Sequence, residues 1–127
     1  MKRKTRKITV NDRKYIWRYK FYDKKSAIII SPVQDKTSMV TIEFSLNISG
    51  KENVEICSFG NYPEYITIKK DDIECRIKTI GPKTVNMMLN QLTDTAFKSR
   101  QNVILNGIEL FTDMGYSITK IEVGMYW

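Results

Sequence analysis

Apolar and polar positions alternate through the start of the chain, and this pattern predicts a two-stranded hairpin over Arg6–Phe21. On its second strand one face is entirely aromatic, with Tyr15, Trp17, Tyr19 and Phe21. A turn through Asn11–Lys14 pairs even positions with odd ones, which places Ile8 and Val10 beside the rings. We therefore expect the rings to face the core and a basic row to occupy the exposed back. That row consists of Lys7, Lys14, Arg18 and Lys20.

The following segments continue the pattern of a sheet. Ala27–Ile30 is a short apolar run that Pro32 ends, which predicts a central strand buried on both faces. Residues 39–46 alternate, and their inward positions are Val40, Ile42, Phe44 and Leu46. A weaker strand is expected over 54–59.

A second hairpin is predicted from residues 65–69 and 73–80, connected around Lys70-Asp71-Asp72. Pairing Ile68 with Ile73 places Ile66 opposite Cys75, so the apolar faces agree. Up to this point the pattern indicates an antiparallel meander of about six to seven strands.

The apolar spacing then changes to that of helices. Gly81-Pro82 is typical of a helix start, because proline is tolerated in the first turn. The first helical stripe is Val85, Met88, Leu89, Leu92 and Ala96, and the second is Val103, Gly107, Leu110 and Met114, widened by Ile104, Ile108 and Phe111. We favour two helices separated near residues 98–102, with Ser99 as the second N-cap, over one helix of about thirty residues.

The chain is expected to close with a strand. Gly115 suits a helix C-terminus, and Ile121, Val123, Met125 and Trp127 alternate after it. The predicted fold class is thus α+β: the meander, one or two helices packed on one of its faces, and a C-terminal strand. One domain over residues 1–127 is expected, with residues 1–5 as a basic, flexible tail.

Charge is concentrated at one end of the sequence. The net charge is +7 over 127 residues, yet residues 1–25 hold eleven Lys or Arg against two Asp, a net of +9. The remaining residues hold ten against twelve, a net of −2. Such a local excess favours an anionic partner, although a solvated strand face with a soluble tail explains it equally well.

Several kinds of chemistry are not expected from this composition. The chain has no histidine, so it lacks the commonest general base and metal ligand. Cys57 and Cys75 fit no metal-binding spacing and are expected to be thiols of a cytoplasmic protein. The acids Asp71, Asp72 and Glu74 lie at a predicted hairpin tip, where a turn-forming role suffices. We predict no catalytic residue, no cofactor and no metal.

The opening and the helix exit resemble a group of short, uncharacterised bacterial proteins. The shared pattern is Ile-Thr-Val-Asn-x-Arg-x-Tyr-x-Trp-Arg-Tyr at residues 8–19, followed late in the chain by Gly115-Tyr116. It implies an aromatic hairpin at the start and no activity. Asp12 stands where a turn glycine is expected, which leaves the turn type open.

Three functions follow as hypotheses. The first is a non-catalytic binding module that engages an acidic face of another protein, of an inhibitor, immunity or defence type. The second is nucleic-acid binding through the basic hairpin. The third is a small-ligand pocket between helices and sheet, lined by Met87, Met88, Phe97 and Phe111.

No apolar run approaches the ~20 residues of a membrane span, and the basic start is not followed by the apolar segment of a signal peptide. The oligomeric state is open. A dimer through the C-terminal strand as a sheet edge is one possibility.

Overall fold

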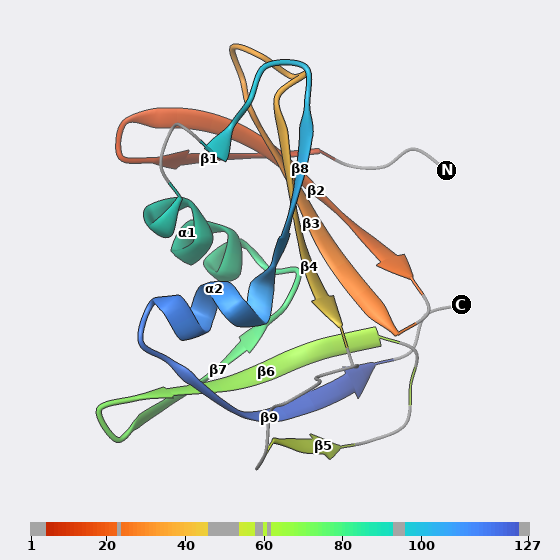
Figure 1. Ribbon diagram of the computed structural model, residues 1–127, viewed down its shortest axis with the longest axis vertical. Helices are drawn as coiled ribbons and strands as arrows, with labels where there is room; N and C mark the ends of the chain where they lie inside the picture. The colour runs from red at the N-terminus through yellow and green to blue at the C-terminus, as the bar shows by residue number, and fades with distance from the viewer. Residues whose placement is uncertain are drawn as a thin grey trace.

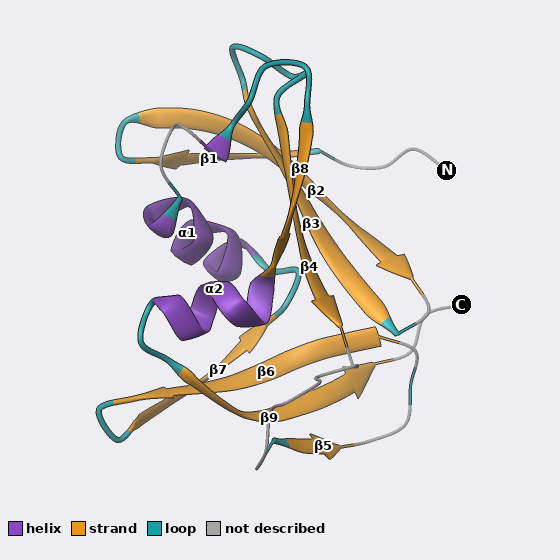
Figure 2. Ribbon diagram, viewed as in Figure 1, coloured by secondary structure: helices purple, strands orange, loops and turns teal. Residues whose placement is uncertain are grey.

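The protein has the α+β fold that the sequence predicts. Its structure is a computed structural model that describes residues 5–22, 24–45, 54–57, 60, 62–92 and 96–124. The strands and helices are β1 (Arg6–Val10), β2 (Arg13–Tyr22), β3 (Lys25–Pro32), β4 (Met39–Ser45), β5 (Glu55–Cys57), β6 (Tyr62–Lys70), β7 (Ile73–Lys78), α1 (Pro82–Gln91), β8 (Asn102–Asn106), α2 (Gly107–Asp113) and β9 (Ser117–Gly124). The strands form two sheets that diverge from one corner, with the helices between them (Figures 1 and 2).

The first sheet has the order β1-β2-β3-β4-β8. Its first four strands are the predicted antiparallel meander, and β8 adds to β4 in parallel. The β3 strand is central and Ala27–Ile30 is buried on both faces, as the continuous apolar run predicts. Pro32 is its last residue. On β4 the inward positions Val40, Ile42 and Phe44 are buried, whereas Leu46 lies outside the described residues.

The N-terminal hairpin has the predicted facing. Ile8 pairs with Tyr15 and Arg6 with Trp17, so the β1 side chains and the rings share one face. The turn is Asn11-Asp12 alone, shorter than the predicted segment, and both residues have positive φ, 53° and 63°. Those values match the twist of a two-residue hairpin, and Asn and Asp are the non-glycine residues that adopt them most readily.

The predicted register of the second hairpin is wrong by two residues. Ile68 pairs with Cys75, and Ile73 pairs with Lys70 instead of Ile68. The strands continue to a two-residue Asp71-Asp72 turn, whose φ values of 53° and 65° repeat those of the first hairpin. Because side chains alternate with period two, a shift of two keeps the apolar faces together. It leaves Ile73 at the tip, 71% exposed.

The second sheet has the order β5-β9-β6-β7. Its β5 strand is the weak strand predicted over 54–59, reduced to three residues. The predicted C-terminal strand forms as β9, and Ile121 and Val123 are buried, but it lies between β5 and β6. β5 pairs in parallel with Lys120–Glu122, so this part of the strand is not the sheet edge that the sequence offers as a possibility. Met125 and Trp127 lie outside the described residues.

The first helix begins where the sequence predicts. Gly81 is its N-cap, Pro82 opens it, and Val85, Met88 and Leu89 are buried. The helix ends at Gln91, so the predicted extension to Ala96 is wrong.

The second predicted helix is correct only from Gly107 onwards. Residues 102–106 are the strand β8, and Asn106, not Ser99, is the N-cap. Its Oδ1 accepts from the amides of Ile108 at 2.9 Å and Glu109 at 3.2 Å. Gly115, with φ of +94°, ends the helix as predicted. The amide of Gly115 donates to Thr112 and that of Tyr116 to Phe111, which satisfies carbonyls of the last turn.

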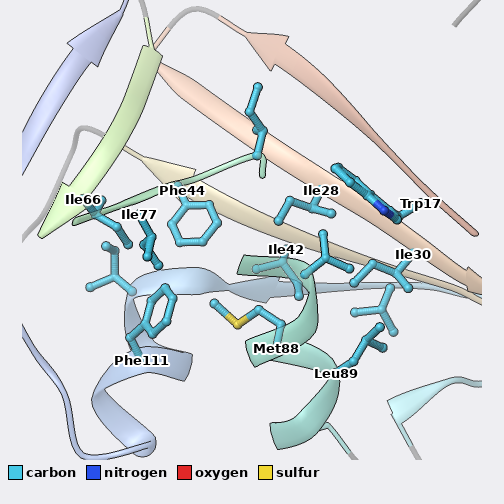
Figure 3. Packing of buried hydrophobic residues seen from close by; sticks show 14 of the residues in the cluster. Trp17, Ile28, Ile30, Ile42, Phe44, Ile66, Ile77, Met88, Leu89 and Phe111 are labelled. Carbon is cyan, nitrogen blue, oxygen red and sulfur yellow. The ribbon is translucent and has the colours of Figure 1, made fainter. Parts of the chain in front are cut away.

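The hydrophobic core lies between the sheets and around both helices. Phe44 from β4, Met88 from α1 and Phe111 from α2 converge there with isoleucines of both sheets (Figure 3). The corner where the sheets meet is polar: Ser26 donates to Thr79 Oγ1 at 3.1 Å, and Thr79 donates to the Pro63 carbonyl at 2.6 Å. The inner face of the first sheet is thus committed to the core, which leaves its other face for a partner.

Candidate functional site

The aromatic row of β2 changes environment along the strand. Tyr15 is buried and Trp17 is only 2% exposed, so these rings belong to the core. Tyr19 is 36% exposed, contrary to the expectation that the whole row faces inward. It lies beside Phe21, at 5.4 Å between ring centroids, beyond the part of β2 that β1 covers. Two of the three rings needed for a nucleobase-stacking platform are therefore unavailable.

The outer face of the first sheet is rich in cations. The strand registers place Lys7, Lys14, Arg18, Lys20 and Lys25 on this face, and we call these five residues the outer basic face. The helices α1 and α2 lie on the opposite side of the sheet (Figure 2). Glu43 is the one acid that the described strands place here, and it lies 3.7 Å from Lys25 Nζ. Five cations against one acid give this face a net charge of +4.

The four residues of the predicted basic row thus lie on one surface, and their side chains differ in how exposed they are. Lys7 and Lys14 are exposed, whereas Arg18 and Lys20 are half-buried. Arg18 lies opposite Ile29 and Lys20 opposite Ala27, and both of these apolar residues are buried. The aliphatic stems of the two cations contribute to covering them, since cross-strand neighbours lie in contact.

Arg18 has an unsatisfied donor. Its Nε is buried and has no hydrogen-bond partner. A buried donor without a partner costs about 1–3 kcal/mol. The guanidinium itself is planar and can donate two parallel hydrogen bonds to a carboxylate. Arg18 is therefore the residue of this face best suited to hold an anionic oxygen pair.

A groove of about 830 Å³ adjoins the outer basic face at the end of the first sheet. Its walls include Arg13, Lys14, Tyr15, Asp35 and Phe97. The rings of Tyr15 and Phe97 lie 5.6 Å apart between centroids and give the groove an aromatic side. Lys14 belongs to both the groove and the basic face, so the two are continuous.

The groove is not the small-ligand pocket that the sequence predicts. Met88 and Phe111 are fully buried in the core, and Met87 packs against it. Of the four predicted lining residues, only Phe97 borders the groove. Helical spacing alone does not distinguish a core methionine from one that lines a cavity.

Asp35, one of two aspartates in the groove wall with Asp12, accepts hydrogen bonds within its own turn. Ser38 donates to its Oδ2 at 2.6 Å, and the Thr37 hydroxyl donates to Oδ1 at 2.5 Å. These bonds, first that from Ser38, lower the pKa of the Asp35 carboxyl below its ordinary value. The carboxylate therefore stabilises the β3–β4 connection.

The outer face of the second sheet provides a contrast, since acids and cations are interspersed on it. Arg76 donates to Glu122 through Nε at 2.6 Å and Nη2 at 3.2 Å. The hydrogen bond from Arg76 lowers the pKa of Glu122. The Arg76 guanidinium also lies 3.7 Å from the ring centroid of Tyr65. A face with internally satisfied charges has less to offer an anionic partner.

The described residues hold no cluster of three or more His, Cys, Asp or Glu that suits a metal ion. Asp71, Asp72 and Glu74 are exposed at the hairpin tip, where the two aspartates form the turn. Cys75 is a free, half-buried thiol that accepts from Lys83 Nζ at 3.2 Å, while Cys57 lies in β5. Among the described helices, none has the length and apolar character needed to cross a membrane.

Sequence reasoning did not find Lys25 or the groove. Lys25 shares a face with Ala27 and Ile29, which is a usable signal, but the continuous apolar run that follows it predicts burial on both faces. The groove depends on a contact between segments more than eighty residues apart, which no local pattern reports. Comparison with protein-family models, curated proteins and solved structures finds no match to this chain.

Proposed function

We propose that this protein is a small, non-catalytic binding module that docks an acidic surface of another protein on its outer basic face. The observation that supports this proposal most is the net charge of +4 on a sheet face that no described helix covers. Electrostatic complementarity of this kind steers association and selects among partners. We propose that this module is a cytoplasmic inhibitor or immunity protein.

The composition of the face favours a protein over a nucleic acid. Tyr22 is exposed on the same face as Lys20, and Arg18 provides a fork for carboxylates. Tyrosine and arginine are the residues enriched at the centres of protein interfaces. The adjoining groove, which the half-buried Phe97 borders, offers a place for an apolar anchor of the partner. A stacked nucleobase would instead need the rings of Tyr15 and Trp17, which are buried.

The test compares two charge-reversal variants with the same change in net charge. In the first, Lys7, Lys14 and Lys20 become Glu; in the control, Lys69, Lys78 and Lys120, on the outer face of the second sheet, become Glu. A fluorescent Glu- and Asp-rich peptide is titrated with each protein and followed by anisotropy. We expect the first variant to lose at least about tenfold in affinity, and the control much less. Equal losses would refute a localised site.

Arg18 allows a sharper test within the same assay. The variant R18K keeps the charge and the stem but lacks the planar fork. If a carboxylate binds through the fork, R18K loses several-fold in affinity at constant net charge. Unchanged affinity would remove Arg18 from the proposed site.

Nucleic-acid binding remains the second candidate, and one observation favours it. Arg18 and Lys20 project from alternate positions of one strand, about 7 Å apart, a spacing that lets cations follow a phosphate backbone. Single- and double-stranded oligonucleotides, titrated in the same assay over a range of salt, test it. Oligonucleotide binding tighter than that of the acidic peptide, with a steep salt dependence, would favour this candidate over the first.

A further inference from the structure

Of the four edge strands that the described residues form, β8 alone carries no charge. The two ends of the first sheet are β1 and β8, and those of the second are β5 and β7. Arg6 and Lys7 lie on β1, Glu55 lies on β5, and β7 alternates Glu74, Arg76 and Lys78. Charged side chains are the usual protection of a sheet edge against pairing. The sequence Asn-Val-Ile-Leu-Asn of β8 lacks that protection.

The backbone of β8 also presents free hydrogen-bonding groups. The Met39 amide donates to the Gln101 carbonyl at 2.9 Å. Together with the parallel register, this bond shows which residues of β8 hydrogen-bond to β4. Residues 101, 103 and 105 therefore direct their backbone groups towards β4. The N–H and C=O of Ile104 point to the open edge, and its side chain is 61% exposed.

The strand is complementary to itself. An antiparallel pair centred on Ile104 places Ile104 opposite its own copy, and Val103 opposite Leu105 on the inner face. Both of those inner residues are only partly buried in the single chain. Asn102 meets Asn106 at each end. Every central position is then matched with an apolar residue, and such cross-strand pairs stabilise a sheet by about 0.2–1 kcal/mol each.

The charges around β8 favour the same arrangement. Lys98 and Arg100 precede the strand, whereas Glu109 and Asp113 on α2 follow it, and all four are exposed. In an antiparallel pair the basic end of one copy meets the acidic end of the other. The strands that carry most of the outer basic face, β1 and β2, lie three to four strand spacings away, roughly 14–19 Å. This exceeds the Debye length of about 8 Å at physiological salt, so their repulsion is weak.

We infer that two copies of this chain associate through β8, edge to edge and antiparallel, to form one continuous sheet across a two-fold axis. The dimer interface is distinct from the outer basic face, which stays open in both copies. Because a five-residue edge buries little area, the dimer should dissociate in the micromolar range.

Sedimentation equilibrium from low to high micromolar protein tests this inference. The variant I104K places two lysines opposite each other at the axis, while I73K alters the more exposed isoleucine of the β6–β7 hairpin. We expect the wild type and I73K to dimerise equally and I104K to weaken dimerisation by at least about tenfold. Circular dichroism establishes that each variant is folded.

Two results would overturn the inference. One is a wild-type chain that stays monomeric throughout the range. The other is a dimer that folded I104K leaves intact. A dimer that I73K disrupts as strongly as I104K counts against β8 as well.

Discussion

Tyr62 is the residue whose ionisation its surroundings perturb most among those described. It is 5% exposed, its ring lies 4.3 Å from that of Phe21, and its hydroxyl donates to Glu64 Oε2 at 3.3 Å. Burial, followed by the negative charge of Glu64, raises the pKa of Tyr62 to about 12. Both effects oppose a phenolate, so the folded protein favours the neutral phenol.

The raised pKa predicts a loss of stability in alkali. Because an unfolded tyrosine ionises near pH 10, the contribution of Tyr62 is fully present below pH 10 and is lost as the pH rises towards 12. Between pH 10 and pH 11 the free energy of unfolding should fall by about 1 kcal/mol more in the wild type than in Y62F. Urea unfolding at the two pH values measures this difference. Parallel losses in the two proteins would show that Tyr62 is not responsible.

At the scale of elements, the passage from β8 into α2 depends on a close approach. Gly107 begins α2 directly under the ring of Phe44, and a Cβ at this position would lie well inside contact distance of that ring. The missing side chain allows the helix to start against β4.

We therefore expect G107A to lower the free energy of unfolding by about 1–3 kcal/mol through overpacking. Replacing Phe44 with Leu in the same protein should cost less than in the wild type, since it makes room for the added methyl group. The control is G81A at the N-cap of α1, where an added Cβ would meet Lys78 Cβ at 3.1 Å. Urea unfolding of the four variants measures these effects. A G107A protein as stable as the wild type would contradict the close approach.

The sequence predicts a strand or a helix correctly where the apolar residues clearly follow the spacing of only one of the two. Alternation over Arg6–Phe21 correctly places Tyr15 and Trp17 in the core, and the helical spacing after Pro82 correctly predicts the buried residues Val85, Met88 and Leu89. The five residues Asn102–Asn106 are too few to distinguish a helical spacing from that of a strand, and the sequence predicts a helix there. The segment forms a strand because it pairs with β4, some sixty residues earlier in the chain. The interior place of β9 has a similar cause, because β5, far earlier in the chain, pairs with it in parallel.

At the scale of the whole molecule, the two sheets divide the roles. Their inner faces and the helices form the core. On the outer face of the second sheet Arg76 pairs with Glu122, whereas the described strands of the first sheet set five cations against one acid, Glu43. The sequence predicted four of the five cations of that face, because alternation assigns side chains to faces. It did not predict the groove, which requires the turns and the segment after α1 to meet in space.

The location of an acidic ligand on the folded protein tests the central claim most directly. Amide chemical shifts of the ¹⁵N-labelled protein, followed as a Glu- and Asp-rich peptide is added, report that location residue by residue. We predict that the largest changes fall on the outer basic face, at Lys14, Arg18 and Lys20, and on the neighbouring positions of β3. Changes confined to the second sheet, or none at saturating peptide in low salt, would contradict the proposal that this face is the docking surface.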